Sequence, residues 1–185
     1  MAKNKKTHIT RSVRLESEVD AGIQEAAAKN GLSVNQLASR ALKRYVEWDF
    51  LADRFGFVEV PPELLQKMVE YLADESIREV GKWFGGTVLK EYVLFWFKEI
   101  NFKNVIKAFP EMIAKYGRMF EYEQIENDDG GMIIIKHQWG EKWSIFYDQT
   151  VKTAFGSLLN CKVKTETSPN QITMSYLFAS IEVVR

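Results

Sequence analysis

The chain has 185 residues, 46% of them hydrophobic and 13% aromatic, which excludes a disordered protein and suits one or two domains. The single cysteine, Cys161, excludes an internal disulfide, and no apolar run approaches the roughly 20 residues of a membrane span. The formal net charge is zero and no signal peptide is recognisable, so we expect a cytoplasmic protein without membrane contact.

The charges are unevenly distributed along the chain. Residues 1–48 hold nine basic and five acidic side chains, a net charge of +4, whereas the remainder holds 16 and 20, a net charge of −4. Before Glu16 every charged residue is basic. Such an arm is typical of a segment that contacts phosphates, although a solubilising tail has the same composition.

Residues 9–15 largely alternate apolar and polar side chains, the period-2 pattern of a half-buried strand. Apolar residues at helical spacing then predict two amphipathic helices. The first ends at Lys29-Asn30-Gly31, where a cation and two residues that tolerate a left-handed backbone form a stop signal. The second begins after Ser33, which has the side chain of a helix cap, and its apolar stripe reaches Val46.

Four features occur here in a characteristic order: the basic arm, the S-V-R-L strand, the G-L-S junction and the A-L-x-x-Y-V end of the second helix. Together they resemble the ribbon-helix-helix DNA-binding family, the Arc/MetJ type of repressor. The resemblance implies an N-terminal domain, residues 1–50, in which two chains pair their strands into a ribbon over a helical core. A segment this short buries too little surface to fold alone, which also favours a homodimer. A tetramer on tandem half-sites stays open.

The resemblance further implies a sequence-specific transcriptional regulator that inserts its ribbon into the major groove of double-stranded DNA. Thr10, Ser12 and Arg14 would face base edges, since Arg bonds bidentately to guanine and hydroxyls bond to several bases. Phosphate contacts would come from a larger set: Lys3, Lys5, Lys6, Arg11, Ser33, Val34 and Asn35. The plain alternatives are solvated strand residues and a purely structural Ser33 cap.

A boundary between Trp48 and Pro61 separates a second domain, residues 57–185. Three helices are expected first, and each has a recognisable limit or break. The first helix starts at Glu63, and glycines mark its end. The second spans residues 88–100. The third spans about 102–116 and has a kink or break at Pro110. The glycines at the end of the first helix are Gly81, Gly85 and Gly86.

The pattern then changes to period 2 at residues 119–125 and 132–139, joined by a hairpin signal at 127–131. A helix with one apolar face follows over about 143–158, and two further strands over 162–167 and 172–183. We therefore expect an α+β fold: the ribbon-helix-helix domain, then three helices and a ββαββ unit with a four-stranded, mostly antiparallel sheet.

Catalytic motifs are lacking, so we expect no enzyme, no catalytic residue, no metal and no cofactor. The sequence has no Gly-rich phosphate loop, HExxH, nucleophile elbow or CxxC. His137 and Cys161 alone cannot supply the four ligands of a zinc site. A lone histidine on an apolar strand face, as at His137, is ordinarily a core residue.

The second domain is rich in aromatic residues, which either fill its core or line an apolar pocket for a small-molecule effector. In the second case His137, Trp139, Trp143 and Tyr147 would lie at a cavity of roughly a few hundred cubic ångströms. A regulator with one polypeptide needs such a sensor, but the domain would equally serve as an assembly module.

Three classes of function compete. The first is the DNA-binding transcriptional regulator. The second is an antitoxin-like DNA-binding protein that binds a protein partner through its C-terminal domain, although such partner-binding parts are usually short, disorder-prone tails. The third, an enzyme with a DNA-tethering arm, lacks a catalytic constellation. We expect a regulator.

Overall fold

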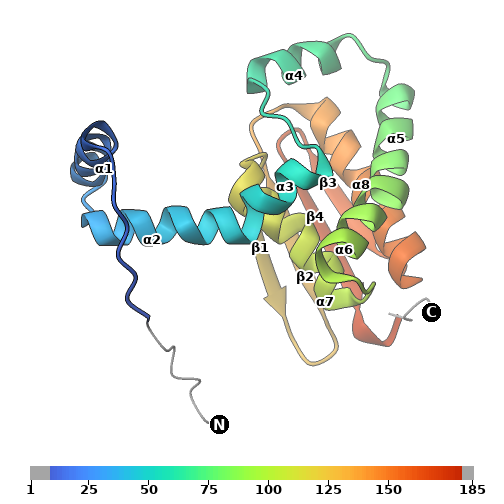
Figure 1. Ribbon diagram of the computed structural model, residues 1–185. Coiled ribbons are helices and arrows are strands. Elements are labelled where there is room, and N and C mark those ends of the chain that lie inside the picture. The colour runs from blue at the N-terminus through green and yellow to red at the C-terminus, as the bar shows by residue number, and fades with distance from the viewer. Residues whose placement is uncertain (1–8, 181–185) are drawn as a thin grey trace. The chain divides into compact units, whose positions relative to one another are not determined.

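A computed structural model describes residues 9–180 of the chain (Figure 1). The chain divides between Asp49 and Phe50 into two compact units. The N-terminal unit ends at Asp49, and the C-terminal unit begins at Phe50.

The described part of the N-terminal unit is helical after residue 16. Its elements are α1 (Ser17–Lys29), α2 (Val34–Arg44) and the π-helical turn η1 (Tyr45–Asp49). The predicted stop of the first helix is confirmed, because Asn30 is the C-cap and Gly31 has a φ of +63°. The predicted cap of the second helix is also confirmed: Ser33 Oγ accepts a hydrogen bond from the backbone N–H of Gln36 at 3.2 Å.

The predicted N-terminal ribbon is wrong for this structure. Residues 9–16 have no regular secondary structure, and no strand occurs in the N-terminal unit from residue 9 onward (Figure 1). The alternation of Ile9, Val13 and Leu15 with polar residues gives an extended chain one apolar and one polar side. A β-strand also needs a neighbouring strand for its backbone hydrogen bonds. No other described segment offers one, and these three side chains are 48–75% exposed.

The C-terminal unit begins with helical segments. They are α3 (Phe50–Phe55), α4 (Pro62–Glu70), α5 (Asp74–Trp83), the π-helical η2 (Phe84–Val88), α6 (Leu89–Phe97), α7 (Phe102–Ile106) and the partly π-helical η3 (Lys107–Gly117). Pro62 stands in the first turn of α4, where its missing N–H costs nothing. The predicted break at Pro110 is confirmed, because the preceding Phe109 has non-helical angles of φ −145° and ψ 124°.

The first two predicted helices of this unit are divided differently in the structure. The expected helix from Glu63 stops at Glu70, and α5 begins anew at Asp74. The glycines expected to end the helix lie inside helical backbone that continues from α5 through η2 into α6. Two of them, Gly81 and Gly85, serve in packing against α8.

The sheet confirms the predicted ββαββ order. Its strands are β1 (Glu121–Glu126), β2 (Gly130–Lys136), β3 (Lys164–Ser168) and β4 (Gln171–Leu177), and α8 (Glu141–Leu159) connects β2 to β3. The strand order is β1-β2-β4-β3 with every neighbouring pair antiparallel. A short 3₁₀ turn, η4 (Phe178–Ser180), follows β4. In the β1–β2 turn, Asn127 Oδ1 accepts backbone hydrogen bonds from Asp129 at 3.0 Å and Gly130 at 2.9 Å.

The core of the C-terminal unit lies between one face of the sheet and α8. Alternate residues of the two central strands are buried, as the period-2 pattern requires. These residues are Ile133, Ile135, Ile172, Met174 and Tyr176. The buried side of α8 presents Tyr147, Val151, Ala154, Phe155 and Leu158. On its other side α8 lies beside α5, as Figure 1 shows.

Two glycines allow α5 and η2 to approach the backbone of α8. A Cβ atom at Gly81 would lie 2.8 Å from the carbonyl oxygen of Phe146, and one at Gly85 would lie 2.4 Å from that of Thr150. Gly81 and Gly85 are four residues apart, as are Phe146 and Thr150, so the contact repeats over one helical turn. Any side chain larger than hydrogen would force the two helices apart.

We predict that Gly85→Ala destabilises the C-terminal unit by about 1–3 kcal/mol, because the added methyl group overpacks a backbone contact. Gly156→Ala is the matched control, since a Cβ there meets nothing within 4 Å and the helix gains about 0.5–1 kcal/mol from the exchange. Urea unfolding followed by circular dichroism measures both. Equal stability of Gly85→Ala and the wild type would contradict the close approach.

Candidate functional site

The three residues predicted to contact bases, Thr10, Ser12 and Arg14, are all exposed. They belong to the non-helical segment before α1, residues 9–16, and none of their side chains forms a hydrogen bond with another described residue. Their polar atoms are thus available to a partner. Lys3, Lys5 and Lys6, which were predicted to contact phosphates, lie outside the described residues.

The cations of the helices are mostly neutralised within the N-terminal unit. Lys29 pairs with Glu25 at 2.6 Å, Lys43 with Glu47 at 3.6 Å and Arg44 with Asp49 at 3.1 Å. By contrast, three described arginines of this unit form no ion pair with any described residue: Arg11, Arg14 and Arg40. Two of these three lie in the non-helical segment, which also contains Glu16 and therefore has a net charge of +1.

The start of α2 offers fewer phosphate donors than the sequence predicted. Ser33 and Gln36 form a reciprocal capping box, in which the Ser33 backbone N–H donates to Gln36 Oε1 at 2.9 Å. The Ser33 N–H is therefore already used. The backbone N–H groups of Val34 and Asn35 have no acceptor among the described residues, so these two remain candidates for an anion.

The two helices of the N-terminal unit leave most of their apolar side chains uncovered. Leu42 is 63% exposed, Val46 69% and Val19 47%. From residue 9 to Asp49, only Ala27 and Trp48 are buried. The apolar stripe that the sequence predicted for α2 is therefore present as a surface rather than as a core.

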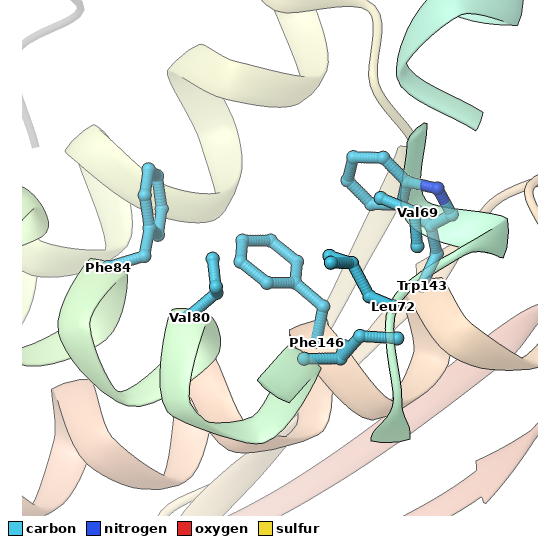
Figure 2. Close-up of a pocket in the computed structure, with 7 residues that line it drawn as sticks. Val69, Leu72, Val80, Phe84, Trp143 and Phe146 are labelled. Atoms are coloured by element: carbon cyan, nitrogen blue, oxygen red, sulfur yellow. The ribbon is translucent and has the colours of Figure 1, made fainter. Parts of the chain in front are cut away.

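The C-terminal unit contains an apolar pocket of about 180 Å³. Its walls come from the end of α4, from α5 and η2, and from the first turns of α8. The lining residues are Val69, Leu72, Ile77, Val80, Phe84, Trp143 and Phe146. Figure 2 shows Phe84 and Trp143 at opposite ends with Phe146 between them, and the Phe146 ring centroid is 5.6 Å and 5.5 Å from theirs. The volume is smaller than the few hundred cubic ångströms expected.

Of the four residues predicted to lie at an effector pocket, Trp143 lines this one and the other three do not. Those three, His137, Trp139 and Tyr147, pack beside Trp143 in an aromatic cluster. Trp139 is 5.5 Å and Tyr147 is 5.8 Å from Trp143 between ring centroids. Trp139 Nε1 donates to the carbonyl oxygen of Met119 at 2.8 Å, so this N–H group is already used in a hydrogen bond within the fold.

Sequence reasoning missed the other six lining residues. A signal was present, because Ile77, Val80 and Phe84 are spaced three and four apart and share one helical face. Phe146 likewise follows Trp143 by three residues. Nothing in the sequence indicated that these two faces meet, since their contact depends on the glycines of α5 and η2.

His137 is buried and holds both ring nitrogens in hydrogen bonds. The Ser144 hydroxyl donates to the Ser168 carbonyl oxygen at 2.6 Å, so His137 Nε2–H donates to Ser144 Oγ at 2.9 Å. His137 Nδ1 then accepts from the backbone N–H of Trp139 at 3.2 Å. Burial lowers the pKa of His137 from 6.5 to about 4, and this neutral arrangement has no acceptor for a second proton.

Among residues 9–180, no group of three or more His, Cys, Asp or Glu side chains is arranged to hold a metal ion. No helix in the same part of the chain combines the length and apolarity needed to cross a membrane. Comparisons with family models, curated proteins and solved structures found no match to the chain. Function is therefore inferred from the geometry and charges of the residues themselves.

We predict that acid destabilises the C-terminal unit through His137. Because its folded-state pKa lies below the unfolded value of 6.5, the neutral imidazole contributes stability above pH 6.5. That contribution is lost as the pH falls from 6.5 to about 4, and it amounts to about 3 kcal/mol. Urea unfolding at several pH values within this window measures the loss.

The control for this titration is His137→Gln, whose amide can still donate to Ser144 Oγ but does not titrate. The variant is expected to be less stable than the wild type at pH 7 and to lose less stability on acidification. Parallel pH profiles for the two proteins would show that His137 does not contribute to the acid sensitivity.

Proposed function

We propose that the protein is a DNA-binding transcriptional regulator that contacts double-stranded DNA as a homodimer through its N-terminal unit. One observation carries the proposal: an exposed, non-helical segment with unpaired Arg11 and Arg14 directly precedes two helices whose apolar faces are uncovered. The first feature supports binding to a polyanion, and the second supports pairing of two chains.

DNA fits this segment better than a simple anion does. Arg14 can donate two hydrogen bonds to guanine in the major groove, while the hydroxyls of Thr10 and Ser12 can donate or accept. Arg11 and the backbone N–H groups of Val34 and Asn35 are suited to phosphates, which carry no sequence information but position the protein. Base-reading and phosphate-binding groups therefore occur close together in the sequence.

A second copy of the chain is the partner that best covers the helices. Val19 on α1, Leu42 on α2 and Val46 on η1 are exposed apolar residues, and a monomeric unit this small gains little from its own core. An isologous contact between identical patches buries this surface on both chains at once. Two copies also double the number of contacts to DNA.

For the C-terminal unit we propose a regulatory role, either as an effector sensor or as an assembly module. The buried residues of its sheet and of α8 form a large core of this unit's own residues. We place this regulator in the cytoplasm, because the DNA of a cell without a nucleus lies there.

We predict that Leu42→Glu converts a dimer into a monomer without unfolding the chain. The side chain is 63% exposed in one chain, so a charge there is hydrated until a second apolar surface covers it. Sedimentation velocity at micromolar concentration measures the change. Ala21→Glu adds the same charge at an exposed position on the opposite side of α1 from Val19, and it should leave the dimer intact. A monomeric wild type, or a dimeric Leu42→Glu, would contradict the proposal.

We predict that Arg14→Ala weakens binding to a duplex selected by the protein from a random pool by about 1–3 kcal/mol, because a bidentate base contact is lost. The loss should be smaller on unrelated duplexes. Fluorescence anisotropy across a panel of duplexes measures both affinities, and wild-type affinity should fall with salt by about 0.9 log units per log unit for each phosphate contact.

Two controls separate base contacts from charge. Lys29→Ala removes the same charge from a cation that is already paired with Glu25, so affinity should change little. Replacing Lys3, Lys5 and Lys6 by Ala should weaken binding to all duplexes about equally. If this triple variant and Arg14→Ala lost affinity in the same pattern across the panel, Arg14 would not contact bases specifically. An affinity that does not change with salt concentration would contradict DNA binding altogether.

A further inference from the structure

We propose that the apolar pocket between α4, α5 and α8 binds one small, uncharged, apolar molecule about the size of a substituted benzene ring. Binding is measurable on protein without DNA, so the inference holds or fails independently of the DNA-binding role. Three features of the pocket support this proposal: its volume, the chemistry of its walls and the position of α4 along one side.

The volume limits the occupant to a single small molecule. An enclosed apolar cavity of about 150 Å³ takes up benzene in general, and this pocket, which is open to the surface, measures about 180 Å³. Drug-sized ligands usually occupy roughly 300–1,000 Å³. The pocket is therefore too small for a nucleotide or a peptide segment, and it suits a molecule of about six to ten non-hydrogen atoms.

The walls exclude charge. All seven lining residues are apolar or aromatic, and no lining residue is ionisable. A carboxylate or ammonium in this space would lose its hydration without gaining a partner, which is strongly unfavourable. Phe84, Phe146 and Trp143 offer edges and faces to a ring, the arrangement that aromatic pairs prefer (Figure 2).

Helix α4 forms one wall and has the properties of a lid. None of its residues is buried, although Val69 and the following Leu72 line the pocket. Its C-terminal end is held by Lys142, whose Nζ donates to the carbonyl oxygens of Glu70 at 2.9 Å and Leu72 at 2.5 Å. An ammonium group at a helix C-terminus is favourable but exchanges readily with water.

The chain's own α4 also argues against a partner protein as the occupant. A helix docking on α5 and α8 would need the place that Val69 of α4 and Leu72, just after it, already occupy. At the same time Leu72 is 39% and Val80 43% exposed, so the pocket reaches the surface and a small molecule can enter. Ile77, which is 2% exposed, lies at the enclosed side.

The test uses the full-length protein and fluorobenzene as the probe, followed by ¹⁹F NMR. We expect saturable binding with a dissociation constant on the order of 1 mM or tighter, as for other very small ligands. Benzene should compete, whereas benzoate, its charged relative, should not. Hydrogen exchange with and without fluorobenzene should show slower exchange in α4 when the probe is bound.

Variants assign the binding to this pocket. Val69→Phe places a ring into the space from α4 and should weaken binding at least about tenfold. Val58→Phe adds the same ring at a position that is 78% exposed and outside the lining, and it should bind as the wild type does. If Val69→Phe does not fold, Val80→Phe fills the pocket from α5, where the side chain is already 43% exposed. Absence of saturable binding to the wild type, or unchanged binding in a folded filled variant, would overturn the proposal.

Discussion

The contact between α5–η2 and α8 is the constraint on which the C-terminal unit depends. At Gly81 and Gly85 the helices are so close that a methyl group would lie within 2.8 Å and 2.4 Å of carbonyl oxygens of α8. Helices at this distance bring the side chains on either side of the contact together. On one side Val80 and Phe84 therefore meet Phe146, and the pocket is the space that these side chains leave unfilled. The glycines thus position the pocket without contributing an atom to its wall.

Neighbouring residues in the first turns of α8 face either the pocket or the core. Trp143 and Phe146 face the pocket, whereas Ser144 and Tyr147 face His137 and the sheet. The hydrogen bonds from His137 to Ser144 and from Ser144 to the Ser168 carbonyl oxygen connect the end of β2, the start of α8 and the end of β3. A second proton would bind at Nδ1, so it would leave these two links in place but remove the acceptor of the Trp139 backbone N–H.

The sequence predicted those parts of the fold that local patterns specify. The hairpin turn near Asn127, the break at Pro110 and the cap at Ser33 each depend on the chemistry of one or two residues, and all three are found. Gly81 and Gly85 were misread as helix ends because a glycine that ends a helix and one that admits a neighbouring backbone look the same in a single sequence. The pocket was placed near Trp143 by its aromatic residues, yet its other walls come from α4 and α5, whose approach is a tertiary effect. The ribbon failed for a related reason: alternation specifies the faces of residues 9–15 but supplies no pairing strand.

The two units differ in how completely they bury their apolar residues. This difference determines whether each unit can be stable as a single chain. The C-terminal unit buries whole faces of two strands and of α8, so its stability is a property of one chain. From residue 9 to Asp49, by contrast, a well-formed capping box and intrahelical ion pairs hold the helices locally, while Leu42 and Val46 remain in water. Exposed ion pairs contribute little to stability, and each helix cap contributes only about 1 kcal/mol. These local interactions therefore do not explain why the helices carry so many exposed apolar side chains. Apolar surface that one chain cannot bury favours association, and the cations without local partners in the same unit favour an anionic ligand. The homodimer on DNA that we propose would bury this apolar surface and place an anionic ligand against these cations.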